Sequence, residues 1–147
     1  MKLTTTQIYQ NMKVLVFAFL ACVTTCSFAQ STKNEKAVKA YYSGFETHNW
    51  DLVEAQLAEG FTFTTPVNDH IAIQEFKENC WPTTKFTKNI KFIKMVESGD
   101  DLIVLVEINT TDNKIARNVD IYTFSKGKIK TIEVFFGQGI SFPGNSK

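Results

Sequence analysis

The spacing of apolar residues changes along this chain, and that change restricts the folds that it can form. Residues 34–48 carry apolar side chains at the spacing of one face of a helix. These side chains are Val38, Tyr41, Tyr42 and Phe45. From residue 90 onward apolar and polar residues alternate, which is typical of strands. Helices that precede a run of strands predict an α+β domain with its helices packed on a sheet.

Further elements are predicted between the first helix and the alternating region. A short helix over residues 50–59 is followed by a strand over residues 61–65, which Pro66 ends. Residues 68–69 are Asn and Asp, which favour the N-cap of a third helix near residues 70–80. The chain is therefore expected to place three helices before its long strands.

Four long strands are predicted in the second part of the chain, separated by short turns. The turns are expected at residues 98–101, 111–114 and 126–127. Consecutive strands joined by such turns pair antiparallel, and long strands make a sheet that twists and curls. We therefore expect three N-terminal helices packed on a strongly curved antiparallel sheet, with a concave central hollow.

The first 29 residues have the features of a signal peptide. Lys13 precedes an apolar run over residues 14–23, and small residues stand at Ser27 and Ala29, as signal peptidases require. The apolar run is too short for a stable membrane span. Met12 is the more economical translation start, since residues 1–11 add nothing that export needs. Cleavage after residue 29 would make the protein secreted or periplasmic, with a single domain over residues 30–140 and a flexible tail over residues 141–147.

Charge and cysteine content limit the partners and cofactors. The chain has 16 basic and 15 acidic residues, a formal net charge of +1, whereas nucleic-acid binding needs a basic face. Only Cys80 remains once the signal peptide is removed, and the two histidines stand far apart. One cysteine and two distant histidines do not match the ligand spacing of a zinc site. We therefore predict no nucleic-acid partner, no metal and no cofactor.

Three segments of the chain resemble a known superfamily. They are AVKAYYSGFETHNWDLVEAQLAEGFTFTTP, AIQEF and VDIYTFSKGKIKTIEVFFG. In this order they resemble the SnoaL-like branch of the nuclear-transport-factor-2-like superfamily, which includes ketosteroid isomerase. The resemblance covers roughly residues 34–137 and implies the cone-like fold. It implies no single activity, because the superfamily contains enzymes, ligand binders and adaptors alike.

The comparison with ketosteroid isomerase can be made residue by residue. That enzyme holds an oxyanion with a helix Tyr and a protonated Asp on a late strand, and a second Asp before a Pro is its general base. The resemblance implies Asp120 for the strand position and Tyr41 or Tyr42 for the helix position. Thr65 stands at the base position, and a Thr hydroxyl does not accept a proton at neutral pH as a carboxylate does. The same isomerisation mechanism is therefore not expected.

Two sets of residues are candidates for the site. The catalytic candidates are Asp120, His70 and Tyr41. The ligand-binding candidates are Tyr41, Tyr42, Thr65, Trp81, Asn118 and Tyr122.

Alternation on the third long strand places Asp120 beside Asn118 and Tyr122. If that face lines the hollow, burial would raise the pKa of Asp120 and suit it to acid–base work; alternatively, Asp120 only organises the sheet. His70 is expected near the pocket mouth or in solvent. Trp81 is expected over the pocket rim or packed in the core.

Three functions agree with these patterns. The first is an exported domain that binds a small, mostly apolar molecule in its hollow. The second is a pocket enzyme with isomerase-, hydratase- or cyclase-like acid–base chemistry. The third is a dimeric adaptor or structural module whose hollow is filled by Phe side chains.

A homodimer is also expected. Helices cover only one face of a sheet, so apolar residues on the other face need a second copy to bury them. The residues predicted for this open face are Val104, Val106, Ile108, Val119 and Ile121.

Overall fold

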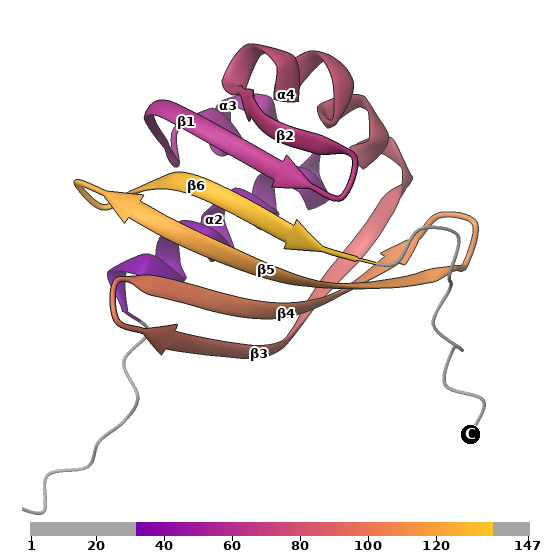
Figure 1. The fold of residues 1–147 in the computed structure, drawn as a ribbon. Coiled ribbons are helices and arrows are strands. Elements are labelled where there is room, and N and C mark those ends of the chain that lie inside the picture. Colours follow the sequence, from indigo (N-terminus) through magenta and orange to yellow (C-terminus); the bar gives the residue numbers. More distant parts are fainter. Residues whose placement is uncertain (1–31, 137–147) are drawn as a thin grey trace, which may run out of the picture. The chain divides into compact units, whose positions relative to one another are not determined.

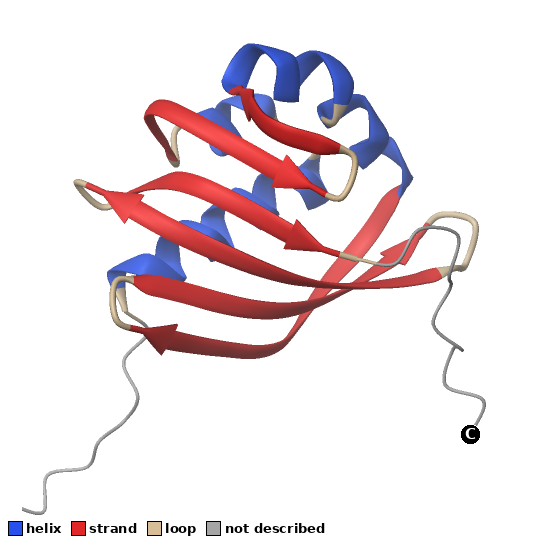
Figure 2. Ribbon diagram, viewed as in Figure 1, coloured by secondary structure: helices blue, strands red, loops and turns tan. Residues whose placement is uncertain are grey.

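The computed structural model describes residues 32–136. The predicted signal peptide over residues 1–29, the alternative start at Met12 and the predicted tail over residues 141–147 lie outside these residues. Figure 1 and Figure 2 show the helices on one side of a single curved sheet. The predicted fold class, α+β with N-terminal helices on a curved and unclosed sheet, is confirmed.

Two N-terminal helices are observed, and the first forms where the apolar spacing predicts it. The second ends at Glu54 rather than near residue 59, because residues 57–60 belong to the first strand, where Leu57 is buried. Helix α2 spans Lys33–Thr47, and the Thr32 side chain caps it by accepting a hydrogen bond from the Glu35 N–H at 3.2 Å. Helix α3 spans Trp50–Glu54 and packs closely on α2. A Cβ on Gly44 would lie 2.5 Å from Cγ2 of Val53, so this crossing requires glycine.

Six strands form one sheet in the order β2-β1-β6-β5-β4-β3. The strands are β1 (Leu57–Thr65), β2 (Asn68–Ala72), β3 (Thr87–Ser98), β4 (Asp101–Thr110), β5 (Ile115–Ser125) and β6 (Lys128–Phe135). All neighbouring strands pair antiparallel except β1 and β6, which run parallel. The predicted meander of four long strands is therefore present, and it joins the earlier hairpin through that parallel pair.

The third helix starts later than the sequence predicts, because residues 68–72 form strand β2 instead of its cap and first turn. Helix α4 spans Ile73–Asn79 and is followed by a 3-10 helix, η2, over Trp81–Phe86. Ile71 is buried and pairs with Phe63 across the β1–β2 hairpin. The burial of Ile71 stabilises a strand at the position where Asn and Asp favour a helix cap.

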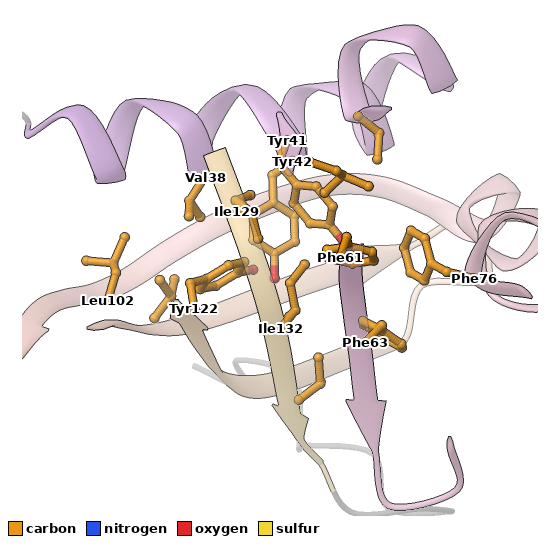
Figure 3. Close-up of a cluster of buried hydrophobic side chains, with 14 of the residues drawn as sticks. Val38, Tyr41, Tyr42, Phe61, Phe63, Phe76, Leu102, Tyr122, Ile129 and Ile132 are labelled. Atoms are coloured by element: carbon orange, nitrogen blue, oxygen red, sulfur yellow. The ribbon is translucent and has the colours of Figure 1, made fainter. Parts of the chain in front are cut away.

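The core lies between α2 and the concave face of the sheet (Figure 3). Val38, Tyr41 and Tyr42 enter it from α2, and Leu102, Tyr122, Ile129 and Ile132 enter it from the sheet. Phe61, Phe63 and Phe76 form an aromatic group at the β1–α4 end of the core, with ring centroids 4.7 Å apart for Phe63 and Phe76.

The prediction of which residues form the open face of the sheet is wrong for the residues of β4. Val104 and Val106 are fully buried in the core rather than exposed on the outer face. They pair with Asp120 and Asn118, and directly paired residues share one face of a sheet. Ile108 lies on this concave face too, whereas Val119 and Ile121 do face outward, opposite Leu105 and Ile103.

Candidate functional site

A cavity of about 180 Å³ opens on the concave side of the sheet. Seven aromatic side chains line it: Tyr41, Tyr42, Phe45, Phe63, Phe76, Tyr122 and Phe136. Thr65, Thr83, Thr84, Thr87 and Asn118 add neutral polar groups, and Asp120 adds a carboxyl group. The cavity therefore combines an aromatic wall with one ionisable acid.

Asp120 is the central polar group of this site. Its side chain is only 1% exposed, and the Tyr42 hydroxyl donates a hydrogen bond to its Oδ2 atom. The Tyr122 hydroxyl donates to the same oxygen at 3.1 Å. The other oxygen, Oδ1, is buried and has no hydrogen-bond partner within the described part of the chain. One oxygen of the carboxyl group is therefore satisfied, whereas the other is left without a partner among the described residues.

Burial sets the protonation of this group. It raises the pKa of Asp120 from 3.8 to about 6, although the hydrogen bonds from Tyr42 and Tyr122 act in the opposite direction. Burial and the nearby Asp120 charge raise the pKa of Tyr42 well above its usual value. The hydroxyls of Tyr42 and Tyr122 therefore remain protonated donors while Asp120 titrates close to neutral pH.

The adjacent tyrosines of α2 take different positions. Tyr42 is the one whose hydroxyl reaches Asp120. Tyr41 lines the cavity and packs its ring against Phe45 at a centroid distance of 4.8 Å. Figure 3 shows both side chains extending from the helix toward Tyr122 on the sheet.

The structure brings six candidates of the sequence together around the cavity. They are Tyr41, Tyr42, Thr65, Asn118, Asp120 and Tyr122. Trp81 does not line the cavity and packs against Phe45 and Trp50, with ring centroids 5.5 and 5.4 Å away.

His70 is not among the lining residues either. Its side chain is 69% exposed, and its Nδ1 atom contacts the Asp69 carboxylate. Residues 68–72 form an edge strand rather than a helix start, which carries the imidazole away from the hollow. Of the two positions expected for His70, the pocket mouth and solvent, the structure shows the position in solvent.

Several lining residues were not found from the sequence. Phe45 shares the apolar face of α2, so its helical spacing was an available signal. Thr83 and Thr84 lie in η2, whose short sequence has no apolar spacing that predicts side-chain direction. Cys80 also lines the cavity, and burial raises the pKa of its thiol, which disfavours the reactive thiolate.

Within residues 32–136, no group of three or more His, Cys, Asp and Glu side chains is arranged to hold a metal ion. None of the described helices is long and apolar enough to cross a membrane.

The family assignment follows from comparison with known proteins. The model of the SnoaL-like domain matches residues 38–132, which is more than half of the chain. The chain belongs to the SnoaL-like domain family. No curated protein matches the chain at a significant level.

Solved structures share the fold of this SnoaL-like domain. An NTF2-like protein of unknown function from Cytophaga hutchinsonii is 25% identical with a TM-score of 0.55, covering 74% of this chain and 92% of that one. An LEH-like epoxide hydrolase from M. tuberculosis is 12% identical with a TM-score of 0.59, covering 73% and 84%. A designed protein with a curved β-sheet is 16% identical with a TM-score of 0.64, covering 72% and 86%.

The tyrosine hydroxyls of this SnoaL-like domain donate to a different acceptor from the one in the oxyanion site of ketosteroid isomerase. There, Tyr and protonated Asp both donate to a ligand oxygen. Here Tyr42 and Tyr122 both donate to Asp120. Thr65, at the base position, accepts hydrogen bonds from the N–H groups of Val67 and Asn68 at 3.2 and 3.1 Å. Its oxygen therefore shapes the β1–β2 turn.

Proposed function

We propose that this SnoaL-like domain binds a small, mostly apolar molecule in its cavity, with one polar group of the molecule at Asp120. The observation that carries this proposal is the buried Oδ1 atom of Asp120, which has no partner among the described residues. A buried polar atom without a partner costs on the order of 1–3 kcal/mol. A ligand that donates a hydrogen bond to this oxygen would recover that free energy.

The size of the cavity limits the ligand. A dry apolar cavity of about 150 Å³ is enough to hold benzene. The cavity of about 180 Å³ therefore suits a molecule built on one ring. The open volume also counts against the adaptor function, which requires Phe side chains to fill the hollow. Phe45, Phe63 and Phe76 line this space without closing it.

Occlusion of the cavity tests the proposal. One-ring compounds are titrated into the protein while its amide signals are followed by NMR, and binding should shift signals around Asp120. Val134 lines the cavity and is 8% exposed, so Val134→Phe should fill the space and abolish these shifts. Val67 is 61% exposed and does not line the cavity, so Val67→Phe is the matched control. Equal shifts in both variants would refute binding in this cavity.

A second candidate function, a pocket enzyme with acid–base chemistry, is favoured by the protonation of Asp120. A group whose pKa is about 6 both gives and takes a proton near neutral pH. Tyr41 lines the same cavity and would orient the substrate. The epoxide hydrolase from M. tuberculosis has a similar fold, which makes pocket chemistry on this scaffold reasonable. Turnover of any isomerase, hydratase or cyclase substrate should be lost in a folded Asp120→Asn variant.

We also propose that the protein is exported and that it is a homodimer. Export rests on the signal-like residues 1–29 and places the domain in the periplasm or outside the cell. N-terminal sequencing of protein recovered from the periplasm or medium tests this, and an uncleaved N-terminus in the cytoplasm would contradict it. The proposed dimer rests on the apolar outer face of the sheet, which a second copy would bury.

A further inference from the structure

The cavity has one negative charge and no positive one. Among the described residues that line it, Asp120 is an acid and there is no Lys, Arg or His. Above about pH 6 this carboxyl group is ionised, while its side chain is only 1% exposed. A buried carboxylate without a counter-charge is strongly disfavoured, because neither water nor a cation compensates it. The described lining residues therefore supply no positive partner for Asp120.

Several hydroxyl groups that line the site are already committed as donors. The hydroxyls of Tyr42 and Tyr122 are committed to Oδ2 of Asp120. Thr83 donates to the Cys80 carbonyl at 2.6 Å, and Thr84 donates to the Trp81 carbonyl at 2.7 Å. Among the buried side-chain polar atoms of the described residues, the one without a partner is an acceptor, Oδ1 of Asp120. A ligand must therefore bring a donor to this oxygen.

The aromatic wall favours a cation over a neutral donor. The rings of Tyr41 and Tyr42 meet edge-on, with centroids 5.2 Å apart and an angle of 75° between their planes. Tyr41 and Phe45 are inclined by 49° at 4.8 Å. These rings contact one another and line one side of the cavity, and the faces of aromatic rings attract ammonium groups.

From these three features we propose that the cavity selects a small organic amine, bound as its ammonium ion with an N–H on Oδ1 of Asp120 and its apolar part among the aromatic rings. This inference rests on the proposed binding function and names its ligand class. A neutral alcohol satisfies the oxygen but leaves the carboxylate charge uncompensated. A carboxylic acid in its ionised form is repelled by Asp120.

Three compounds of nearly equal size test this selection by calorimetry at about pH 8. They are benzylamine, benzyl alcohol and benzoate, which differ in the charge of one substituent. Benzylamine should bind about ten-fold more tightly than benzyl alcohol, since a hydrogen bond between charged groups is about twice as strong as a neutral one. Benzoate should not bind.

Asp120→Asn keeps the size of the side chain and removes its charge. In this variant benzylamine should lose its advantage and bind within about two-fold of benzyl alcohol. Asp100 lies in the exposed β3–β4 turn, so Asp100→Asn removes one carboxylate elsewhere and should leave the ten-fold preference intact. Circular dichroism establishes that both variants are folded.

A pH series on the unmodified protein gives an independent readout that needs no variant. The titratable groups around Asp120 are Tyr41 and Tyr42 from α2, Tyr122 from β5 and Cys80 at the end of α4, and the pKa of each is raised. Asp120 is therefore the group that titrates near pH 6. Benzylamine affinity should rise as pH increases through about 6, and benzyl alcohol affinity should change less.

The outcomes separate the two proposals. If benzyl alcohol binds as tightly as benzylamine, or if the preference survives Asp120→Asn, the cavity binds small molecules without selecting ammonium, and the inference is overturned. If none of the three compounds binds at any pH of the series, both the inference and the proposed binding of one-ring molecules fail.

Discussion

Burial of Asp120 links the stability of the domain to pH. The pKa of this carboxyl group rises from 3.8 to about 6 on folding, so the folded state binds the proton more tightly than the unfolded chain does. The resulting stabilisation is fully present below about pH 4 and is lost as pH rises through 6. Ionisation of Asp120 therefore destabilises the folded domain near neutral pH.

Asp120→Asn should remove this dependence. The free energy of unfolding of the variant, relative to the unmodified protein, should increase by up to about 3 kcal/mol between about pH 4 and pH 8, since each pKa unit corresponds to about 1.4 kcal/mol. Urea denaturation at a series of pH values measures the difference. Asp100→Asn, in an exposed turn, is the matched control for the loss of one carboxylate. If the difference in the free energy of unfolding between Asp120→Asn and the unmodified protein does not change with pH, folding does not raise the pKa of the Asp120 carboxyl group.

The two tyrosines of α2 should affect this titration differently. Tyr42 donates to Asp120 and so lowers the pKa of the carboxyl group, which means that Tyr42→Phe should raise that pKa above about 6. NMR titration of the Asp120 side-chain carbon measures the change. Tyr41→Phe is the matched control and should leave the pKa closer to its original value, because the Tyr42 bond remains. If Tyr41→Phe changes the pKa of Asp120 more than Tyr42→Phe does, then Tyr41 rather than Tyr42 donates the hydrogen bond to the carboxyl group.

Side chains alternate along a strand with a period of two, so the sequence alone predicts that Asn118, Asp120 and Tyr122 share one face of their strand. It could not choose between Tyr41 and Tyr42. Adjacent helical residues point about 100° apart, and the apolar pattern tolerates a rotation of that size. Only the packing of α2 on the sheet fixes which hydroxyl meets the carboxyl group.

At the scale of elements, the distance between α2 and α3 depends on Gly44. A Cβ at this position would meet Val53 at 2.5 Å and the Asn49 carbonyl at 3.0 Å. Gly44→Ala should therefore destabilise the domain by about 1–3 kcal/mol, although alanine favours the helix. Thermal unfolding measures the loss, and Ser43→Ala at the exposed neighbouring position should change stability little. If Gly44→Ala were instead more stable than the unmodified protein, α3 would be able to move away from α2 at little cost in free energy.

The β1–β2 hairpin shows why one element was missed. Asn68 and Asp69 are good cap residues, and local preference alone favours a helix there. The hydroxyl of Thr64 instead accepts a hydrogen bond from the His70 N–H at 3.1 Å, and Thr65 holds the turn. These bonds and the burial of Ile71 depend on a partner strand, so the local sequence does not reveal them.

At the scale of the whole domain, both faces of β4 are apolar, which explains the wrong assignment of Val104 and Val106. The run Leu102–Val106 contains no polar residue, so alternation gives no direction. The outer face carries Ile103, Leu105, Val119, Ile121 and Phe135, and the last of these is 53% exposed. An apolar outer face is therefore present, although different residues of β4 form it.

The composition of this outer face favours burial against a second copy. Glu107 lies beside the apolar group and is only 7% exposed, with Arg117 Nε and Nη2 donating to one of its oxygens at 2.8 and 2.7 Å. The carboxylate is thus paired before any partner arrives, and its desolvation in an interface costs less than that of an unpaired charge. Apolar patches with such a paired polar group are suited to association.

Val119→Lys should therefore convert the proposed dimer into a monomer. Val119 is 38% exposed at the centre of this face, opposite Leu105 and Phe135, so a lysine there would bring two like charges into a symmetric interface. Sedimentation at micromolar concentration measures the change in mass. Val67→Lys adds the same charge at an exposed turn away from the face and should remain dimeric. A monomeric unmodified protein would show that this apolar face is left open to solvent or to another partner.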